Sequence, residues 1–190
     1  RKDVSAMTRD EKIYKLAKVI TDRKEALLGI EKLSPDSPEY WGINRALIFV
    51  RDKYGVQCEE DTLDLALKMK KRKPVTFGVL KERTGWDDER LNKALDCICD
   101  CGLVEYHWEN LDGKNPNHEK RWVLDMFVPG SAEIMLIHPD MCDQQPQIAD
   151  FFERMAYLPL AGITELVPPG GAGIGMHVIP VEKAIPAESQ

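Results

Sequence analysis

The chain has 190 residues and a formal net charge of −6, with 43% hydrophobic and 31% charged residues. This composition is typical of a globular protein and excludes a disordered chain. The acidic balance argues against a general nucleic-acid binder, because such proteins are usually basic. No run of about 18 apolar residues is present, so no membrane-spanning helix is expected.

The five cysteines predict a reducing environment. Three of them, Cys97, Cys99 and Cys101, stand at alternate positions, and an odd total is a poor disulfide framework. The charged N-terminus has no secretory signal, so we expect a cytoplasmic protein with reduced thiols. The chain begins at Arg1 and ends without a sign of a folded segment, which favours a fragment of a longer protein.

Two helices are predicted in the first part of the chain. Thr8 and Glu11 have the spacing of a capping box, and apolar residues at helical intervals predict a helix over residues 9–28. A second helix is predicted to begin with Pro38 at its first position. Residues 1–56 are therefore expected to form an N-terminal helical hairpin.

Three further helices are predicted next. The first begins near Asp61, and its apolar face runs into a basic stretch that Pro74 ends. A short second helix ends near Thr84, and a third repeats apolar residues at spacings of three and four until Gly102. This order is that of a helix-turn-helix variant.

A β-hairpin is predicted to follow these helices. Residues 103–108 alternate and are rich in β-formers, and residues 121–127 give a second strand after a turn-rich loop. Three helices and a hairpin wing predict a winged-helix-like domain over residues 57–130. Residues 131–190 are expected to form a helix and an extended, Pro/Gly-rich connector to a missing downstream domain. The predicted fold class is thus α+β and mainly helical.

The winged-helix order suggests DNA binding, in which the third helix would read the bases. That helix carries five acidic residues and two basic ones, Arg90 and Lys93. Five minus two leaves three excess negative charges, which would repel the phosphates of DNA. The candidate phosphate contacts are Lys70, Lys71, Arg72 and Lys73. Cations are also favoured at a helix C-terminus, which is the simpler account of this run. Nucleic-acid binding is therefore disfavoured, and a DNA-binding transcriptional regulator is retained as an alternative.

The alternate cysteines are a second candidate site. Side chains two residues apart on a helix point about 200° apart, so Cys97 and Cys99 cannot bind one ion. Cys97 and Cys101 can lie on one face with His107 nearby, which keeps a thiol-based metal or redox sensor as an alternative. Cysteine is also among the most buried residue types, so a role as core filler is the simpler interpretation. No metal ligand is assigned.

A glycine-rich segment forms the third candidate. Its members are Gly170, Gly171, Gly173 and Gly175. A dinucleotide-binding fingerprint needs a strand before its glycines and a helix after them. Here a Pro-Pro pair precedes the glycines, an extended stretch follows them, and no Lys-Ser or Lys-Thr pair completes a phosphate loop. These glycines are therefore interpreted as a hinge.

No other pattern points to catalysis. The four histidines are scattered, and no Ser, His and Asp spacing suggests a triad. The tryptophans are expected to anchor the core or an interface; they are Trp41, Trp86, Trp108 and Trp122. No complete catalytic or cofactor site is therefore predicted in this chain.

The downstream part resembles a known family. The stretches RWVLDMFVPG (121–130), FFERM (151–155) and residues 167–185 are similar to FAD-dependent pyridine nucleotide-disulfide oxidoreductases of anaerobic bacteria. These proteins also contain ferredoxin-like 4Fe–4S domains and are similar to the small subunit of glutamate synthase. The resemblance covers about residues 60–186. In such proteins the cluster-binding cysteines would follow this segment, and this chain has no Cys-x-x-Cys motif.

The resemblance implies the N-terminal module of an electron-transfer flavoprotein. FAD, NAD(P) and 4Fe–4S clusters are expected in the parent protein, and no cofactor in this chain. We therefore expect a non-catalytic docking or dimerisation module of a larger iron–sulfur flavoprotein oxidoreductase. Its expected partners are the downstream redox domains of the same chain, or a second copy in a homodimer.

Overall fold

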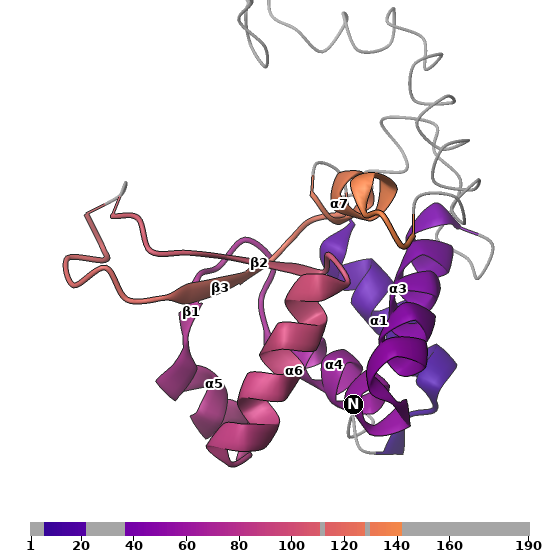
Figure 1. Cartoon of the computed structure of the whole chain (residues 1–190), viewed down its shortest axis with the longest axis horizontal. Helices are drawn as coiled ribbons and strands as arrows, with labels where there is room; N and C mark the ends of the chain where they lie inside the picture. The colour runs from indigo at the N-terminus through magenta and orange to yellow at the C-terminus, as the bar shows by residue number, and fades with distance from the viewer. Residues whose placement is uncertain (1–5, 22–36, 111–112, 128–129, 142–190) are drawn as a thin grey trace, which may run out of the picture.

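The computed structural model describes residues 6–21, 37–110, 113–127 and 130–141 (Figure 1). Within these ranges the chain forms six helices and a three-stranded antiparallel sheet. The prediction of a mainly helical α+β protein is confirmed at this level. The predicted hinge glycines and almost all of the predicted connector lie outside the described residues.

Helix α1 (Arg9–Ile20) begins with the predicted capping box. Thr8 Oγ1 accepts a hydrogen bond from the Glu11 backbone N–H at 3.2 Å, and the Thr8 N–H donates to Glu11 Oε2 at 2.9 Å. The helix ends before Thr21, whose backbone is extended, so the prediction that it continues to residue 28 is wrong. The Ile20 carbonyl accepts a hydrogen bond from the Phe127 N–H at 2.9 Å instead of one from a further helical turn.

Helix α3 (Pro38–Tyr54) begins as predicted, with Ser37 as N-cap and Pro38 in the first turn. Gly55, at φ 98°, ends α3 and is also the N-cap of α4 (Val56–Lys68). The prediction that this helix begins near Asp61 is wrong. Its first turns bury polar and sulfur-bearing side chains rather than an apolar stripe, so the hydrophobic pattern begins too late.

The end of α4 also differs from the prediction. Met69 is extended, so the basic stretch lies beyond the helix and Pro74 does not end it. Lys71 forms a parallel bridge with Leu124, and the Arg72 N–H donates to the Leu124 carbonyl at 2.8 Å. Arg72 adopts a left-handed backbone (φ 55°). Pairing with a strand distant in sequence therefore replaces the expected final helical turns.

Two helices follow the short strand β1 (Val75–Thr76). They are α5 (Phe77–Thr84) and α6 (Asp88–Asp100). Gly85 is left-handed and ends α5, and Asp87 caps α6 by accepting a hydrogen bond from the Arg90 N–H at 2.9 Å. The predicted third helix is thus confirmed, with its cap at Asp87.

Strands β2 (Val104–His107) and β3 (Arg121–Leu124) form the predicted hairpin. The sheet order is β1-β3-β2, and both pairings are antiparallel. The hairpin projects away from the helices, with its loop at the far end (Figure 1). The sheet is thus anchored at one end and free of the helical body at the other.

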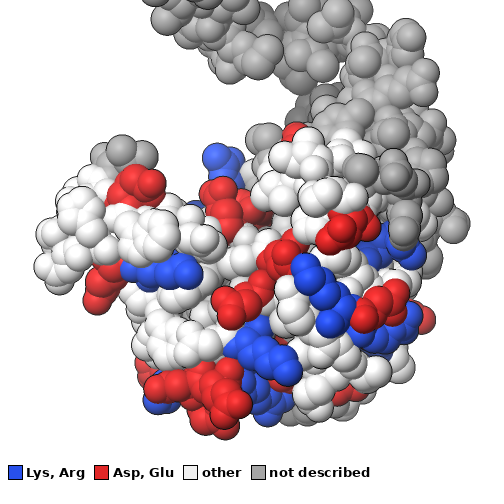
Figure 2. Space-filling model, in the orientation of Figure 1, with Lys and Arg blue, Asp and Glu red and all other residues white. Residues whose placement is uncertain are grey.

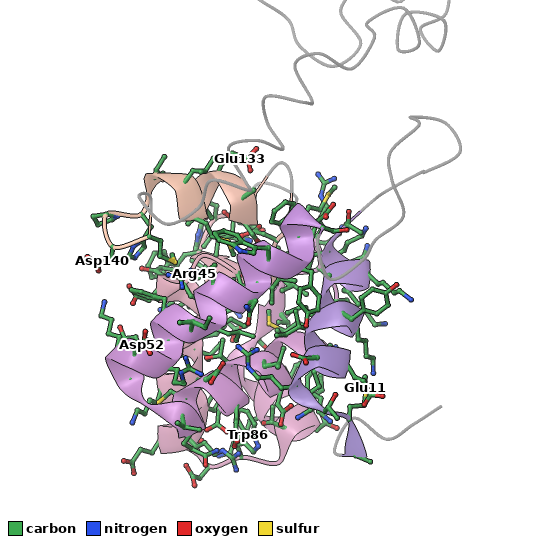
Figure 3. The ribbon with its side chains drawn as sticks, turned by 90° about the vertical axis from the view of Figure 1, so that its right-hand side faces the viewer. Glu11, Arg45, Asp52, Trp86, Glu133 and Asp140 are labelled. Atoms are coloured by element: carbon green, nitrogen blue, oxygen red, sulfur yellow. The ribbon has the colours of Figure 1, made fainter. Side chains whose placement is uncertain are left out.

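A short helix, α7 (Ser131–Ile137), follows the sheet. Figure 3 shows α7 above α3, and Trp86 at the opposite end of the molecule. One hydrophobic cluster joins buried residues of α1, α3, α4, α6, α7 and the sheet. The Phe127 N–H donates to the Ile20 carbonyl at 2.9 Å, which ties the chain after β3 to the end of α1.

Two buried carboxylates of α4 fix its neighbours. Glu59 is 5% exposed and accepts hydrogen bonds from Arg9 Nε and Nη2 of α1 at 2.8 and 2.6 Å. Asp61 is 6% exposed and forms a bidentate pair with Arg90 of α6 at 2.6 and 3.1 Å. A buried carboxylate is costly without its cation, so these pairs set how α1 and α6 pack on α4.

No described helix is both long enough and apolar enough to cross a membrane.

We predict that Gly102→Ala destabilises the fold more than Gly85→Ala. Both glycines have positive φ, at 80° and 70°, so each substitution costs about 1 kcal/mol of backbone strain. A Cβ at Gly102 would also lie 2.7 Å from Ile134 Cγ2, whereas Gly85 faces open space. Overpacking adds about 1–3 kcal/mol at Gly102 alone. Urea unfolding of both variants measures this difference, and equal losses would contradict the packing of α6 against α7.

Candidate interaction surface

Two exposed aromatic side chains and the buried Trp122, which is 6% exposed, surround one lysine on the hairpin. We call Tyr106, Trp108, Lys120 and Trp122 the hairpin cluster. The Lys120 ammonium lies 3.9 Å from the Tyr106 ring centroid, 5.3 Å from that of Trp122 and 5.8 Å from that of Trp108. The Tyr106 and Trp108 rings meet edge to face, with centroids 5.3 Å apart. Tyr106 is 45% exposed and Trp108 is 47% exposed.

Strand alternation explains why these aromatics meet. Val104 pairs with Leu124 and Tyr106 pairs with Trp122, so these four side chains lie on one face of the hairpin. At its base this face covers the core, where Leu124 is fully buried and Val104 is 2% exposed. Further out on this face Trp122 stays buried beside Phe77 of α5, whereas Tyr106 is exposed to solvent. The core face of the sheet thus continues as an exposed surface.

A buried asparagine fixes the loop beside this cluster. Asn115 is 1% exposed, and its side-chain amide donates to the carbonyls of Trp108, Glu109 and Glu119 at 3.1, 3.3 and 2.9 Å. Its Oδ1 accepts from the Glu119 N–H at 3.0 Å. One side chain therefore holds both arms of the loop together. A surface fixed in this way loses little conformational entropy when it binds a partner.

The outer face of α6 does not suit a polyanion. Its exposed charged residues are Asp88, Glu89, Arg90, Lys93 and Asp96. Arg90 is already paired with Asp61, and its guanidinium lies 4.3 Å from the Trp86 ring centroid. At the lower end of Figure 2 an acidic patch lies beside a basic patch. Phosphate binding at this helix would therefore meet an acidic surface.

The four basic candidates lie between α4 and β1, but the structure uses two of them to join the sheet. Besides its backbone bond, Arg72 donates from its guanidinium to Met126 Sδ at 3.4 Å. Lys71 is half-buried, and burial together with Arg72 lowers its pKa. Lys70 and Lys73 are exposed. The run is therefore partly structural, which its charge alone does not reveal.

The candidate cysteines lie in the core. Cys97 and Cys101 are fully buried, while His107 lies on β2 with its Nδ1 3.4 Å from Glu109 Oε2. Cys58 of α4 is also buried and is close enough to Cys97 to raise the pKa of its thiol. Among the described residues, no three His, Cys, Asp or Glu side chains could hold a metal ion together. The arrangement is that of packed thiols between helices.

Burial disfavours the thiolate form of Cys97, Cys99 and Cys101. Burial, followed by the neighbouring Cys58, raises the pKa of Cys97 to about 12. Burial also raises the pKa of Cys99 to about 12, and that of Cys101 above its usual range. The thiolate is the form that reacts with oxidants and binds metals, so these cysteines are suited to packing.

A small pocket lies on the other face of the hairpin and holds a perturbed carboxyl group. Asp125 lines this pocket, is 8% exposed, and its Oδ2 has no hydrogen-bond partner. Burial, and then the nearby charge of Glu105, raise the pKa of Asp125 to about 7. Neither Asn115 nor Asp125 was predicted from the sequence, because both look like ordinary polar residues near a turn.

The comparisons with known proteins give no relative for this chain: no family model, no curated protein and no solved structure matches it.

We predict slow alkylation of Cys97, Cys99 and Cys101 in the folded protein. At pH 8 a thiol with a pKa of about 12 is ionised on the order of a thousandfold less than an ordinary thiol. Iodoacetamide labelling, followed peptide by peptide with mass spectrometry, compares the folded protein with the protein in guanidinium chloride. Labelling of Cys97 within tenfold of the unfolded rate would favour a thiol-based sensor instead.

We also predict that Asp125→Asn stabilises the protein at pH 8 but not at pH 4. The folded protein keeps the Asp125 proton up to about pH 7, whereas the unfolded chain loses it near its ordinary pKa of 3.8. The free energy of unfolding of the wild type therefore falls as the pH rises from about 4 to 7. Above pH 7 it stays at this lower value. The variant should gain about 1–3 kcal/mol at pH 8. Urea unfolding at both pH values measures this, and a gain independent of pH would contradict it.

Proposed function

We propose that residues 56–127 form a winged-helix unit whose hairpin is a protein-docking surface. The element order supports this unit: a helix, a short strand, two helices joined by a tight turn, and a two-stranded hairpin. The sheet order supports it too, since β1 pairs with β3, the second arm of the hairpin. In this proposal the partner contacts the hairpin cluster, and the chain itself is not catalytic.

The proposal depends mainly on the exposure of Tyr106 and Trp108. Aromatic residues are enriched in the buried centres of protein interfaces, and a few of them supply most of the binding energy. Here they stand next to Lys120, on a sheet whose base is packed and whose loop is fixed by Asn115. A rigid aromatic surface of this kind suits protein recognition.

A protein partner is favoured over duplex DNA by the surface of α6. In the DNA-reading use of a winged helix this helix enters the major groove. Its exposed surface is acidic on balance, and Arg90 is held by Asp61. The hairpin carries aromatic surface with charges of both signs around it, which suits a protein better than a phosphate backbone.

The partner is proposed from the family resemblance of residues 121–130, 151–155 and 167–185. On that basis the chain docks onto the redox domains of a larger iron–sulfur flavoprotein. Those domains would follow in the same reading frame and would bring FAD, NAD(P) and 4Fe–4S clusters. The module would hold these domains in place, either within one chain or across a homodimer.

We predict that the double variant Tyr106→Ala/Trp108→Ala weakens docking at least tenfold, because it removes two central aromatic contacts. The measurement is calorimetric titration of this chain with the separately produced remainder of its reading frame, purified without oxygen. The matched control is Val79→Ala/Ile137→Ala, which removes exposed apolar side chains at 37% and 80% exposure away from the hairpin. The control should bind like the wild type.

Two results would contradict this proposal. Equal affinity of the wild type and the hairpin variant would show that the cluster is not the docking surface. A remainder of the reading frame without flavin and iron–sulfur absorbance would refute the redox partner, whatever the hairpin does.

A further inference from the structure

The outer face of the sheet contains a pocket of about 330 Å³. Its lining residues are Arg72, Pro74, Glu105, His107, Val123, Asp125 and Met126. It lies on the opposite side of the hairpin from the hairpin cluster, because Val123 pairs with Glu105 while Tyr106 pairs with Trp122. This volume is at the small end of ligand pockets and suits a molecule of few heavy atoms.

Asp125 is the polar residue in this pocket that lacks a partner. It follows β3 on the same face as Val123, and its backbone N–H donates to the Leu103 carbonyl at 3.2 Å. The residue is more than nine-tenths buried, yet its Oδ2 accepts no hydrogen bond. A buried carboxylate oxygen without a hydrogen bond lowers the stability of the fold. A donor that reaches this oxygen would therefore bind with favourable free energy.

The charge around Asp125 favours a cation. Glu105 lines the same pocket from β2, and its charge raises the energy of an ionised Asp125. Arg72 is the pocket's own cation, but its guanidinium is directed to Met126 Sδ and leaves Asp125 Oδ2 unpaired. An entering cation would reduce the repulsion between the two carboxylates.

The other walls favour a short hydrocarbon chain. Val123 and Met126 are each 8% exposed, and Pro74 completes an apolar side of the pocket. A single unpaired oxygen suits the compact ammonium group, whereas a guanidinium fork is best matched by both oxygens of a carboxylate.

We propose that this pocket binds a small alkylammonium ion, with its nitrogen donating to Asp125 and its hydrocarbon chain against Pro74, Val123 and Met126. This inference does not rest on the docking proposal, since it concerns the opposite face of the hairpin. It adds a small-molecule site to a chain otherwise proposed to bind proteins.

The test uses n-butylamine as the probe, with n-butanol and butyrate as matched molecules of no charge and of opposite charge. Binding is followed by ¹H–¹⁵N chemical-shift changes of the whole 190-residue chain at pH 8. We expect saturable shifts at residues 104–107 and 123–126 with butylamine, and at least tenfold weaker effects with the other two molecules. Asp125→Asn should weaken butylamine binding at least tenfold, while the control Glu119→Gln, outside the pocket, should not.

The pH dependence identifies the group that binds the ammonium ion. Because Asp125 gains a proton near pH 7, butylamine should bind about tenfold more weakly at pH 6 than at pH 8. The other titratable or charged groups at the pocket are His107, Glu105 and Arg72, and the pKa of the nearby half-buried Cys99 thiol of α6 is raised to about 12. The Asp125→Asn variant should lose this dependence. A dependence that persists in the variant would assign it to a group other than Asp125 and overturn the proposal.

Three other results would overturn it. Equal binding of butylamine and butanol would show an apolar pocket without charge recognition. Equal affinity of wild type and Asp125→Asn, with both folded by circular dichroism, would exclude the carboxylate. Binding only in an Arg72→Gln variant would show that Arg72 itself occupies the site in solution.

Discussion

The arrangement of this chain depends on two ion pairs at α4. Glu59 and Asp61 are buried two residues apart, and each needs a cation from a different neighbouring helix. Arg9 supplies one from α1, and Arg90 supplies the other from α6. Rotation of either helix would therefore leave a buried carboxylate of α4 without its cation. Since β2 follows α6 after a tight turn at Gly102, the orientation of the hairpin is set by the same constraint.

Local signals in the sequence predicted the elements with strong caps, and missed those set by distant contacts. The Thr8 capping box and the helix start at Pro38 were found because each acts within one turn of helix. The start of α4 was missed because its first buried residues include Glu59, whose partner is 50 residues away. Its end was missed because Arg72 pairs with Leu124, on a strand that no local pattern connects to it.

The same limit applies to the two surfaces of the hairpin. Strand alternation predicted the hairpin, and tryptophans were expected in a core or an interface. Trp122 is buried in the core, whereas Trp108 is 47% exposed. The roles of Asn115 and Asp125 could not be predicted from the sequence, because burial of a polar side chain depends on the loop or strand packed against it. The hairpin therefore offers an aromatic face on one side and an unpaired carboxyl on the other.

The most direct test of the docking account is hydrogen–deuterium exchange by mass spectrometry. It compares this chain with the same chain extended to the end of its natural reading frame. The account predicts slower exchange in the hairpin, residues 104–124, of the extended chain, and unchanged exchange in α6. Unchanged exchange in the hairpin, or protection of α6 instead, would contradict the claim that the hairpin is the surface that meets the partner.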